Sequence, residues 1–505
     1  MLKRYHTKSA VTSALLPIFF VYYHSVFCVL KPYNSLSEIQ ADLANASVSC
    51  EALVNHYLEN INQKNALLNV FLAVYDQEAR QRAAEIDQKI TNGTAGRLAG
   101  MVLGIKDVLC YQDHGLQAGS KILANFTSQF TATAVQRLLD EDAIIIGRQN
   151  CDEFAMGSSN ENSAFGPTRN AADPSRVPGG SSGASAVAVQ ADMCLASLGS
   201  DTGGSVRQPA AFCGVVGLKP TYGRISRWGL VAYGSSFDCI GPITKTVDDA
   251  ALLLEIMAGK DDFDSTVSNK PVPNYSQLTA NSTLPTLRIG YLREGVESEA
   301  VQPEVRAQTR AMLDHLDTQG HAVEAVDFEL LPYLLPTYYI LTTAEASSNL
   351  SRYDGVRYGF RSQNAHDLES LYKKTRTEGF GTEVKRRILL GTFVLSASYY
   401  DAYYTKAQQV RRLIKDKTDI LFEKYDFLVM PTTPTTAFAL GEKSADPIQM
   451  YLADIFTVQA NVVGYPALSI PNGTDDQGLP IGFQIMGRPF EEEKLLAFGK
   501  KIAQK

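Results

Sequence analysis

The chain has no histidine between His114 and His315, although its most glycine-rich turns lie in that interval. A serine hydrolase of the common type needs a histidine as general base beside its nucleophile. A local Ser-His-Asp triad is therefore excluded for any serine in this part of the chain. Lysine is the remaining candidate base, and it serves only when burial and neighbouring groups keep it neutral.

Closely spaced cysteines and runs of like charge are also missing. The seven cysteines are scattered and form no CxxC pair, which argues against a zinc knuckle or a disulfide framework and favours buried, reduced thiols. No metal site is expected. The 47 basic and 54 acidic residues give a net charge of −7, and no block of five like charges occurs. DNA binding is therefore not expected, and an RNA partner would need another chain to supply most of the positive field.

The first 34 residues differ from the rest of the chain. Basic residues precede an apolar run over residues 11–30, and the first acidic residue is Glu38. This pattern is typical of signal and membrane segments, but Pro17, His24 and the lack of a small-residue cleavage site weaken both interpretations. An overextended gene start, a processed targeting segment and a retained membrane anchor stay open. We expect a bacterial-type cytoplasmic protein, with the mitochondrial matrix as the alternative.

From residue 35 onward the pattern predicts an α/β protein. Residues 35–38 form a capping box that starts a helix, and short apolar strands then alternate with amphipathic helices. Strands are expected at 69–72, 101–105, 143–147, 194–198, 287–292, 427–430, 467–469 and 481–486, and helices at 48–61, 73–90, 132–139, 182–190 and from about 205. This rhythm indicates a sheet with helices on both faces.

Two longer stretches bear on domain organisation. Residues 259–285 are rich in Asp, Asn, Ser, Thr and Pro, which predicts an exposed loop, and helical periodicity dominates over residues 303–424. Strands from both ends of the chain are needed to complete the sheet, so the chain cannot easily be cut in two. We predict one domain over residues 35–505, with a largely helical lobe at about 303–424.

Residues 176–209 carry the chemistry. They place Ser181 and Ser205 in glycine-rich turns on either side of one expected helix and one expected strand. Glycines let several backbone N–H groups converge beside Ser205, and each such donor stabilises an oxyanion by about 3–4 kcal/mol. Upstream, Lys106 ends a short apolar strand. The combination favours amide hydrolysis, in which Ser205 attacks and Ser181 relays its proton to a neutral Lys106.

Other interpretations of these motifs fail. The glycine-rich turn that carries Ser181 lacks the Gly-Lys-Ser/Thr of a phosphate loop. Arg207 stands where the GxSxG elbow of α/β-hydrolases has its second glycine. The SxxK match at residues 370–373 has no KTG element to accompany it.

The combination resembles the amidase signature family, whose Ser–cis-Ser–Lys triad corresponds to Ser205, Ser181 and Lys106. The resemblance implies that family's α/β fold, a large mixed, twisted sheet covered by helices on both faces. It also implies a cis peptide bond between residues 180 and 181. The oxyanion hole would be formed by the backbone amides of Thr202, Gly203, Gly204 and Ser205.

Further segments are similar to the A subunits of aspartyl/glutamyl-tRNA amidotransferases. These are residues 150–159, 344–350, 383–393 and 399–404, and the resemblance covers roughly residues 35–500. Ala184 replaces a glycine of the serine-rich turn and spares the triad, and Cys151 stands where methionine is commoner.

The resemblance implies a glutaminase, which hydrolyses glutamine to glutamate and passes on ammonia. Arg387 would pair with the α-carboxylate of glutamine, Asp454 would hold the α-ammonium group, and Tyr338 would line the pocket. Without the resemblance, Arg387 would be taken as part of a solvated helix face, since Lys385, Arg386 and Arg387 are consecutive.

The same resemblance implies a heterotrimer that works as a ligase with glutamine as amido donor. A B subunit would activate Glu-tRNA(Gln) or Asp-tRNA(Asn) with ATP and Mg²⁺, and a small C subunit would bridge the A and B subunits. This chain would need no cofactor of its own and would meet tRNA mainly through the B subunit. Two alternatives stay open: a stand-alone amidase acting on an apolar or aryl amide, and a non-catalytic assembly scaffold.

Overall fold

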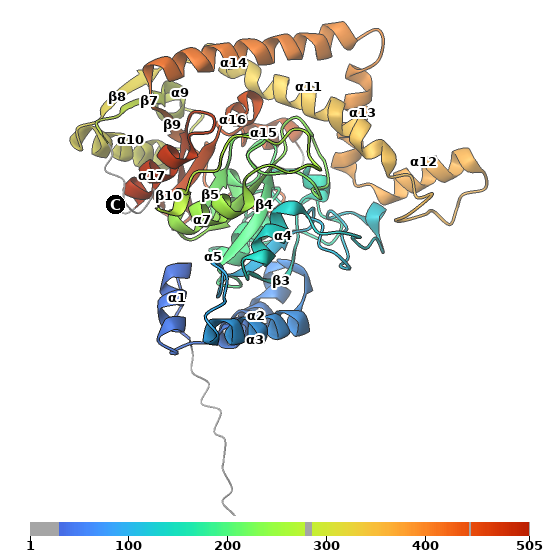
Figure 1. Ribbon diagram of the computed structural model, residues 1–505. Helices are drawn as coiled ribbons and strands as arrows, with labels where there is room; N and C mark the ends of the chain where they lie inside the picture. Colours follow the sequence, from blue (N-terminus) through green and yellow to red (C-terminus); the bar gives the residue numbers. More distant parts are fainter. Residues whose placement is uncertain (1–29, 278–284, 444–445, 504–505) are drawn as a thin grey trace, which may run out of the picture. The chain divides into compact units, whose positions relative to one another are not determined.

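A large mixed sheet runs through the centre of the protein (Figure 1). The computed structural model describes residues 30–277, 285–443 and 446–503, so the predicted leader, residues 1–34, lies almost entirely outside the described residues. The chain divides into a unit of residues 1–31 and a second unit, Pro32–Lys505, and only the second is considered below. None of the helices in the described ranges is long and apolar enough to cross a membrane.

In the described residues the sheet has eleven strands in the order β1-β3-β2-β4-β6-β5-β10-β11-β9-β7-β8. Their bounds are β1 (Phe71–Val74), β2 (Val102–Lys106), β3 (Ile144–Gln149), β4 (Ala196–Asp201), β5 (Val216–Lys219), β6 (Cys239–Thr244), β7 (Arg288–Leu292), β8 (Ala322–Val326), β9 (Phe427–Pro431), β10 (Ala467–Thr474) and β11 (Pro480–Met486). The strands at its centre are buried along their whole length, as expected where helices cover both faces. The predicted fold class is confirmed.

The helices that cover the sheet and form the lobe are α1 (Leu36–Ala44), α2 (Cys50–Leu68), α3 (Asp76–Thr91), α4 (Thr133–Asp140), α5 (Gly183–Gln190), α6 (Arg207–Cys213), α7 (Val247–Met257), α9 (Arg293–Glu297), α10 (Pro303–Thr318), α11 (Leu331–Asn349), α12 (Leu368–Gly379), α13 (Thr382–Val394), α14 (Lys406–Lys424), α15 (Pro447–Leu452), α16 (Val458–Val463) and α17 (Glu492–Ala503). Short helical turns are η1 (Lys121–Leu123), η2 (Glu153–Ala155), η3 (Leu350–Arg352) and η4 (Asp401–Thr405).

Local sequence sets several of these boundaries. The side chain of Ser35 accepts a hydrogen bond from the backbone N–H of Glu38, so α1 begins at the predicted cap. Asn69 adopts a left-handed conformation and ends α2, which is why the first strand begins at Phe71, two residues later than predicted. Most other predicted strands and helices are found within a few residues of their expected bounds.

Three stretches differ from expectation. No element was predicted between the helix near residue 205 and the loop at 259, but strands β5 and β6 and helix α7 lie there. The interval 303–424, predicted as a largely helical lobe, also contains the edge strand β8, which pairs in parallel with β7. Its residues alternate only weakly between buried and exposed, so their strand pattern is faint. In the described part of the predicted exposed loop, 259–277, Tyr275 is fully buried and its hydroxyl accepts a hydrogen bond from Arg224. That loop is therefore anchored to the core.

Strand direction brings the chemically interesting residues together. Strands β2, β3 and β4 are parallel neighbours, so their carboxyl ends lie at the same edge of the sheet. Strand β2 ends at Lys106, β4 ends at Asp201 and leads into the loop that carries Ser205, and β3 leads into residues 150–159. In open α/β sheets, ligands bind at such carboxyl ends.

Candidate active site

Lys106 is fully buried at the end of β2, in contact with three serine hydroxyls. Its Nζ lies 2.7 Å from the Oγ of Ser181, 2.9 Å from that of Ser182 and 3.0 Å from that of Ser200. Burial lowers the pKa of Lys106 to about 8, against the opposing effect of nearby acidic groups that include Asp152. About a tenth of the amine is therefore neutral at pH 7, a far larger fraction than for an exposed lysine.

The turn that carries Ser181 has the cis peptide bond expected from the resemblance, between Gly180 and Ser181. The backbone N–H of Gly180 donates to Gln208 Oε1 at 2.8 Å. A Cβ atom at Gly180 would lie 2.2 Å from a carboxylate oxygen of Asp152 and 2.6 Å from the backbone nitrogen of Ser159. Glycine is thus required here because neighbouring atoms approach the backbone closely.

Ser205 lies in the loop between β4 and α6, beside the cis turn. Its carbonyl accepts a hydrogen bond from the backbone N–H of Ser182 at 3.1 Å. Ser205 is 9% exposed, whereas Ser181 and Lys106 are 0% exposed. Of the three residues, Ser205 is the one that an incoming molecule can reach.

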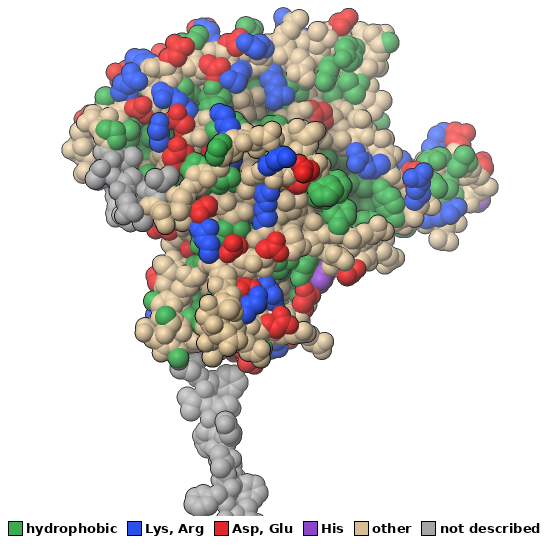
Figure 2. All heavy atoms as spheres, in the orientation of Figure 1, with side chains coloured by type: hydrophobic (Ala, Val, Ile, Leu, Met, Phe, Trp, Pro, Cys, Tyr) green, Lys and Arg blue, Asp and Glu red, His purple; other side chains and the backbone are tan. Residues whose placement is uncertain are grey.

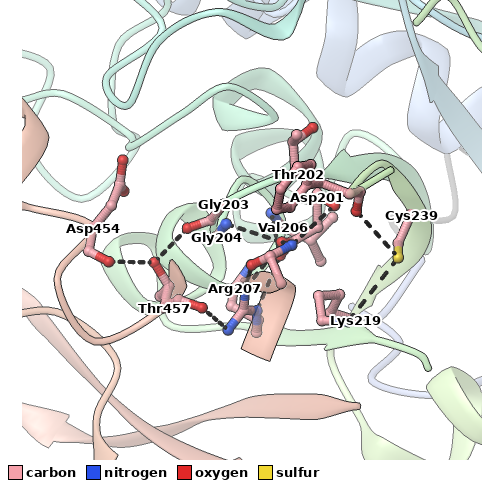
Figure 3. A network of polar contacts seen from close by, with 12 residues as sticks. Asp201, Thr202, Gly203, Gly204, Val206, Arg207, Lys219, Cys239, Asp454 and Thr457 are labelled. Atoms are coloured by element: carbon pink, nitrogen blue, oxygen red, sulfur yellow. Dashed lines mark hydrogen bonds and ion pairs between the residues drawn. The ribbon is translucent and has the colours of Figure 1, made fainter. Parts of the chain in front are cut away.

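The carboxylate of Asp201 organises this nucleophile loop (residues 202–206; Figure 3). It accepts hydrogen bonds from the backbone N–H groups of Gly204 at 2.9 Å and Val206 at 3.1 Å. Gly204 has a φ of +134° and no room for a side chain, because a Cβ atom would lie 2.2 Å from Thr457 Oγ1. The loop therefore holds its unusual backbone conformation through one carboxylate and one glycine.

Asp201 is itself held by Arg207 in a fully buried ion pair of 3.0 Å. Burial alone would raise the pKa of Asp201, but the charge and hydrogen bonds of Arg207 outweigh it and hold the pKa at about 2. Arg207 also donates to the carbonyl of Thr457 at 2.9 Å and to the side chains of Gln484 and Asn461, each at 2.6 Å. The loop is thus tied to α16 and β11.

Arg207→Met is expected to lower the free energy of unfolding by about 3–5 kcal/mol, because it leaves the buried carboxylate of Asp201 without its charge partner. The control is Arg412→Met, which removes an exposed pair with Asp416 and should change the value by less than about 0.5 kcal/mol. Urea unfolding followed by fluorescence checks both. Equal effects of the two substitutions would contradict the role given to the buried pair.

Arg387 points inward from α13 and is buried, whereas its neighbour Arg386 lies on the exposed face. Its Nε donates to Glu383 Oε1 at 2.9 Å and its Nη1 to the hydroxyl of Tyr233 at 2.8 Å. The rings of Tyr339 and Tyr451 lie 5.3 and 5.5 Å from the guanidinium carbon. An arginine enclosed in this way is positioned to bind a carboxylate, and a solvated helix face is excluded for it.

Asp454 is buried on the segment between α15 and α16, where its Oδ2 accepts a hydrogen bond from Ser158 at 2.5 Å. Burial raises the pKa of Asp454 to about 7, although Ser158 and the charge of Arg387 both lower it. Thr457 Oγ1 lies 3.0 Å from the carbonyl oxygen of Asp454 and 2.7 Å from that of Gly203, which joins this segment to the nucleophile loop (Figure 3).

Tyr338 is buried against the same loop. A Cβ atom at Gly203 would lie 2.5 Å from its hydroxyl oxygen. The structure thus brings Lys106 and Ser181 into direct contact. It also places Tyr338 and Asp454 around the loop that carries Ser205 and the predicted oxyanion amides, with Arg387 near enough to Asp454 to lower its pKa. Among the described residues, no group of three or more His, Cys, Asp or Glu side chains could hold a metal ion.

Sequence reasoning missed several residues of the site. These are Ser182 and Ser200, which contact Lys106, together with Ser158, Tyr233 and Glu383, which hold the charged residues. Ser158 lies in a segment that the sequence singled out, and Ser200 lies in the glycine-rich turn. For Tyr233 the sequence carries no signal, since its partner Arg387 is 154 residues away along the chain.

Comparison with known proteins shows the family of the chain. Residues 52–496 match the family model described as Amidase. The chain belongs to the amidase family. The match spans the predicted triad and both charged residues of the clamp, the name used below for Arg387 and Asp454.

Proteins named as amidotransferase subunits and a protein named as a peptide amidase are similar to this chain. The A subunit of glutamyl-tRNA(Gln) amidotransferase from Chlorobium luteolum is 52% identical over 93% of this chain and 97% of that protein. The crystal structure of the A subunit of glutamyl-tRNA(Gln) amidotransferase from Thermotoga maritima is 40% identical with a TM-score of 0.72, covering 88% of this chain and 90% of that one. A native peptide amidase from Stenotrophomonas maltophilia is 29% identical with a TM-score of 0.75, covering 92% and 95%.

Proposed function

We propose that this chain is the glutaminase component, the A subunit, of a tRNA-dependent amidotransferase. It hydrolyses glutamine to glutamate and supplies the ammonia that converts Glu-tRNA(Gln), and in some cells Asp-tRNA(Asn), to the amidated form. The observation that carries the proposal is a buried carboxyl group, Asp454, joined to the nucleophile loop through Thr457, with a buried cation, Arg387, near enough to lower its pKa. A free amino acid offers one partner for each. Relatives about half identical over nearly the whole chain bear the name of this component.

In the proposed acylation step, the Oγ of Ser205 attacks the side-chain amide carbon of glutamine. Its proton passes to Ser181, whose own hydroxyl proton passes to the lone pair of neutral Lys106. The two N–H bonds of that amine remain for Ser182 and Ser200, which lie 2.9 and 3.0 Å away. The backbone amides of Thr202, Gly203 and Ser205 stabilise the oxyanion, whereas the amide of Gly204, also expected to do so, donates to Asp201 in this structure.

Collapse of the tetrahedral intermediate breaks the C–N bond. The proton held by Lys106 returns through Ser181 to the leaving nitrogen, which departs as ammonia, and a γ-glutamyl ester remains on Ser205. Water then attacks the ester and gives its proton to the same relay. Release of glutamate restores the serine hydroxyl, so no cofactor is consumed in this chain.

Arg387→Ala is expected to raise KM for glutamine about 100-fold, because removal of a buried partner of a carboxylate costs on the order of 3 kcal/mol. The matched control is Lys385→Ala, two residues earlier on the same helix, whose amine donates to the carbonyl of Thr377 at 3.1 Å; it should leave KM within about twofold. The measurement is ammonia release by the assembled complex over a range of glutamine concentrations. Similar values of KM for both variants would overturn the glutamine assignment.

The kinetic constants should depend on pH in two separate ways. Lys106 acts as a base only when neutral, and its pKa is about 8, so kcat should rise with pH and level off above about pH 8. Asp454 binds an ammonium group only when ionised, and its pKa is about 7, so KM for glutamine should fall as pH rises through about 7. Steady-state kinetics between pH 5.5 and 9.5, on the order of half-unit steps, separate the two. A kcat that falls with rising pH would contradict a lysine base.

We also propose the heterotrimer with B and C subunits, in which the B subunit uses ATP and Mg²⁺ and meets most of the tRNA. Basic and acidic side chains are mixed over the face drawn in Figure 2, and the chain is acidic overall, so another chain supplies the positive field that tRNA needs. The six described cysteines are buried free thiols, which supports a reducing compartment such as the cytoplasm.

The test is purification of the tagged chain from its own cells, followed by identification of the proteins that come with it. We expect two partner chains, and a complex that converts Glu-tRNA(Gln) to Gln-tRNA(Gln) with ATP and glutamine. A chain that purifies alone and hydrolyses apolar amides in preference to glutamine would instead establish a stand-alone amidase.

A further inference from the structure

Asp238, just before β6, is a buried carboxyl group that the proposed chemistry does not use. Its Oδ1 accepts hydrogen bonds from Thr202 Oγ1 at 2.6 Å and from the backbone N–H of Gly234 at 3.2 Å. Its Oδ2 accepts one from the backbone N–H of Tyr233 at 3.0 Å. One carboxyl group therefore holds the first residue of the nucleophile loop and the start of the segment 233–238.

Tyr233, the first residue of this segment, contacts Arg387 through its side chain. The hydroxyl of Tyr233 accepts a hydrogen bond from Arg387 Nη1 at 2.8 Å and donates one to Thr342 Oγ1 at 3.0 Å. Its ring also lies against the guanidinium group, with the centroid 5.5 Å from Cζ. Tyr233 thus fixes where Arg387 lies, and Asp238 fixes where the backbone of Tyr233 lies.

We propose that Asp238 is a positioning residue that holds the nucleophile loop and Arg387 at a set distance from each other. The chain of contacts runs from Thr202 through Asp238 and Tyr233 to Arg387, and it rests on the proposed function, in which a single glutamine bridges the two ends. Only the torsions about the Cα–Cβ and Cβ–Cγ bonds change the span of glutamine between its α-carboxylate and its side-chain amide carbon, so that span has an upper limit. The distance between clamp and oxyanion hole therefore decides whether that carbon reaches Ser205.

The rate of hydrolysis should depend strongly on the distance between Arg387 and the nucleophile loop. A misplacement of about 1 Å between a bound substrate and the catalytic groups costs on the order of 100-fold in rate, and side chains that support a site are what prevent it. A buried carboxyl group with three hydrogen-bond donors is a strong constraint, because hydrogen bonds strengthen where water is excluded. Asp238 is such a carboxyl group, and it lies between the nucleophile loop and the tyrosine that contacts Arg387.

Three variants separate the roles. Thr202→Val removes the contact on the loop side and should lower kcat for glutamine about 10-fold while KM changes less than about twofold. Tyr233→Phe removes the hydroxyl on the clamp side and should raise KM about 10-fold with a smaller change in kcat. Asp238→Asn cannot satisfy all three donors and should do both. Thr202→Ser keeps the hydroxyl and should recover most of the kcat that Thr202→Val loses.

The matched control is Tyr222→Phe, which removes a tyrosine hydroxyl that donates to the carbonyl of Ser235 at 2.9 Å. It touches the same segment, 233–238, but not the clamp, so kcat and KM should both stay within about twofold. All variants are measured as the assembled complex, with the active fraction determined by titration. A purely structural role of Asp238 would reduce that fraction and leave KM unchanged.

The inference is overturned if Asp238→Asn changes kcat alone or KM alone. It is also overturned if Thr202→Val and Tyr233→Phe change kcat and KM in the same proportion. If Asp238→Asn does not fold, the double variant Thr202→Val/Tyr233→Phe decides. Its loss in kcat/KM should then be at least about threefold smaller than the product of the single losses, and a full product overturns the coupling. A wild-type complex that does not hydrolyse glutamine overturns the proposed function together with this inference, whereas an active wild type with no division overturns the inference alone.

Discussion

Ser205→Ala is expected to lower kcat for glutamine hydrolysis by a factor on the order of 10⁴ or more, as for the loss of a nucleophile in other serine hydrolases. Ser181 cannot replace it, because Ser181 is fully buried and its Oγ lies 2.7 Å from Lys106. The clamp is untouched by the substitution, so the variant should still bind glutamine. Ammonia release by the assembled complex measures the first effect, and calorimetric titration with glutamine measures the second.

The matched control for this substitution is Ser185→Ala, on the buried face of α5, where the hydroxyl faces the carbonyl of Leu198 at 3.4 Å. Its kcat should stay within about threefold of the wild type, since only one weak neutral hydrogen bond is lost. Loss of turnover in both variants would point to a folding defect. Turnover by Ser205→Ala at more than about one hundredth of the wild-type rate would contradict a serine nucleophile at this position.

Lys106→Met is expected to lower kcat by a factor of about 10³–10⁴, the effect of losing a general base, without lowering the melting temperature. The folded state holds this amine at a pKa of about 8, below its ordinary value of 10.5. The unfolded state therefore binds more protons, and the wild-type protein loses stability as pH falls from about 10.5 to about 8, with no further loss below that range. Methionine has a similar length and no charge to desolvate, so this contribution disappears.

Lys219→Met is the matched control, because Lys219 is the other lysine among the largest fully buried side chains. Its amine donates to the carbonyl of Pro220 at 2.8 Å, away from the serines, and burial lowers its pKa as well. Activity should stay within about fivefold of the wild type. Calorimetric melting and ammonia release check both variants. Lys106→Met with more than about a tenth of the wild-type kcat, or with a clear fall in melting temperature, would contradict the account.

The sequence allowed most of the sheet and the centre of the site to be predicted because both depend on local pattern, although strands β5, β6 and β8 were missed. Lys106, Ser181 and Ser205 stand at the ends of short apolar strands or in glycine-rich turns, where periodicity and turn chemistry are informative. The parallel arrangement of β2 and β4 then brings them together. The clamp was predicted only through the resemblance, since Arg387 lies in a run of three basic residues that carries no sign of burial.

Contacts between residues that are far apart in the chain could not be predicted from the sequence. Ser158 and Asp454 are 296 residues apart, and Tyr233 and Arg387 are 154 apart. Each pairing is decided by the path of the whole chain, so neither local propensity nor motif spacing contains it. Strand β8 was not predicted, for a different reason. It is a short edge strand between two long helices, and its alternation is too weak to stand out.

The most direct test of the central claim is to trap the ester during turnover. The assembled complex is mixed with glutamine, quenched in acid within the steady state and digested, and its peptides are analysed by tandem mass spectrometry. The account predicts a γ-glutamyl adduct on Ser205, absent from Ser205→Ala and from samples without glutamine. A glutamyl adduct on a cysteine, or continued ammonia release by Ser205→Ala at the wild-type rate, would contradict it.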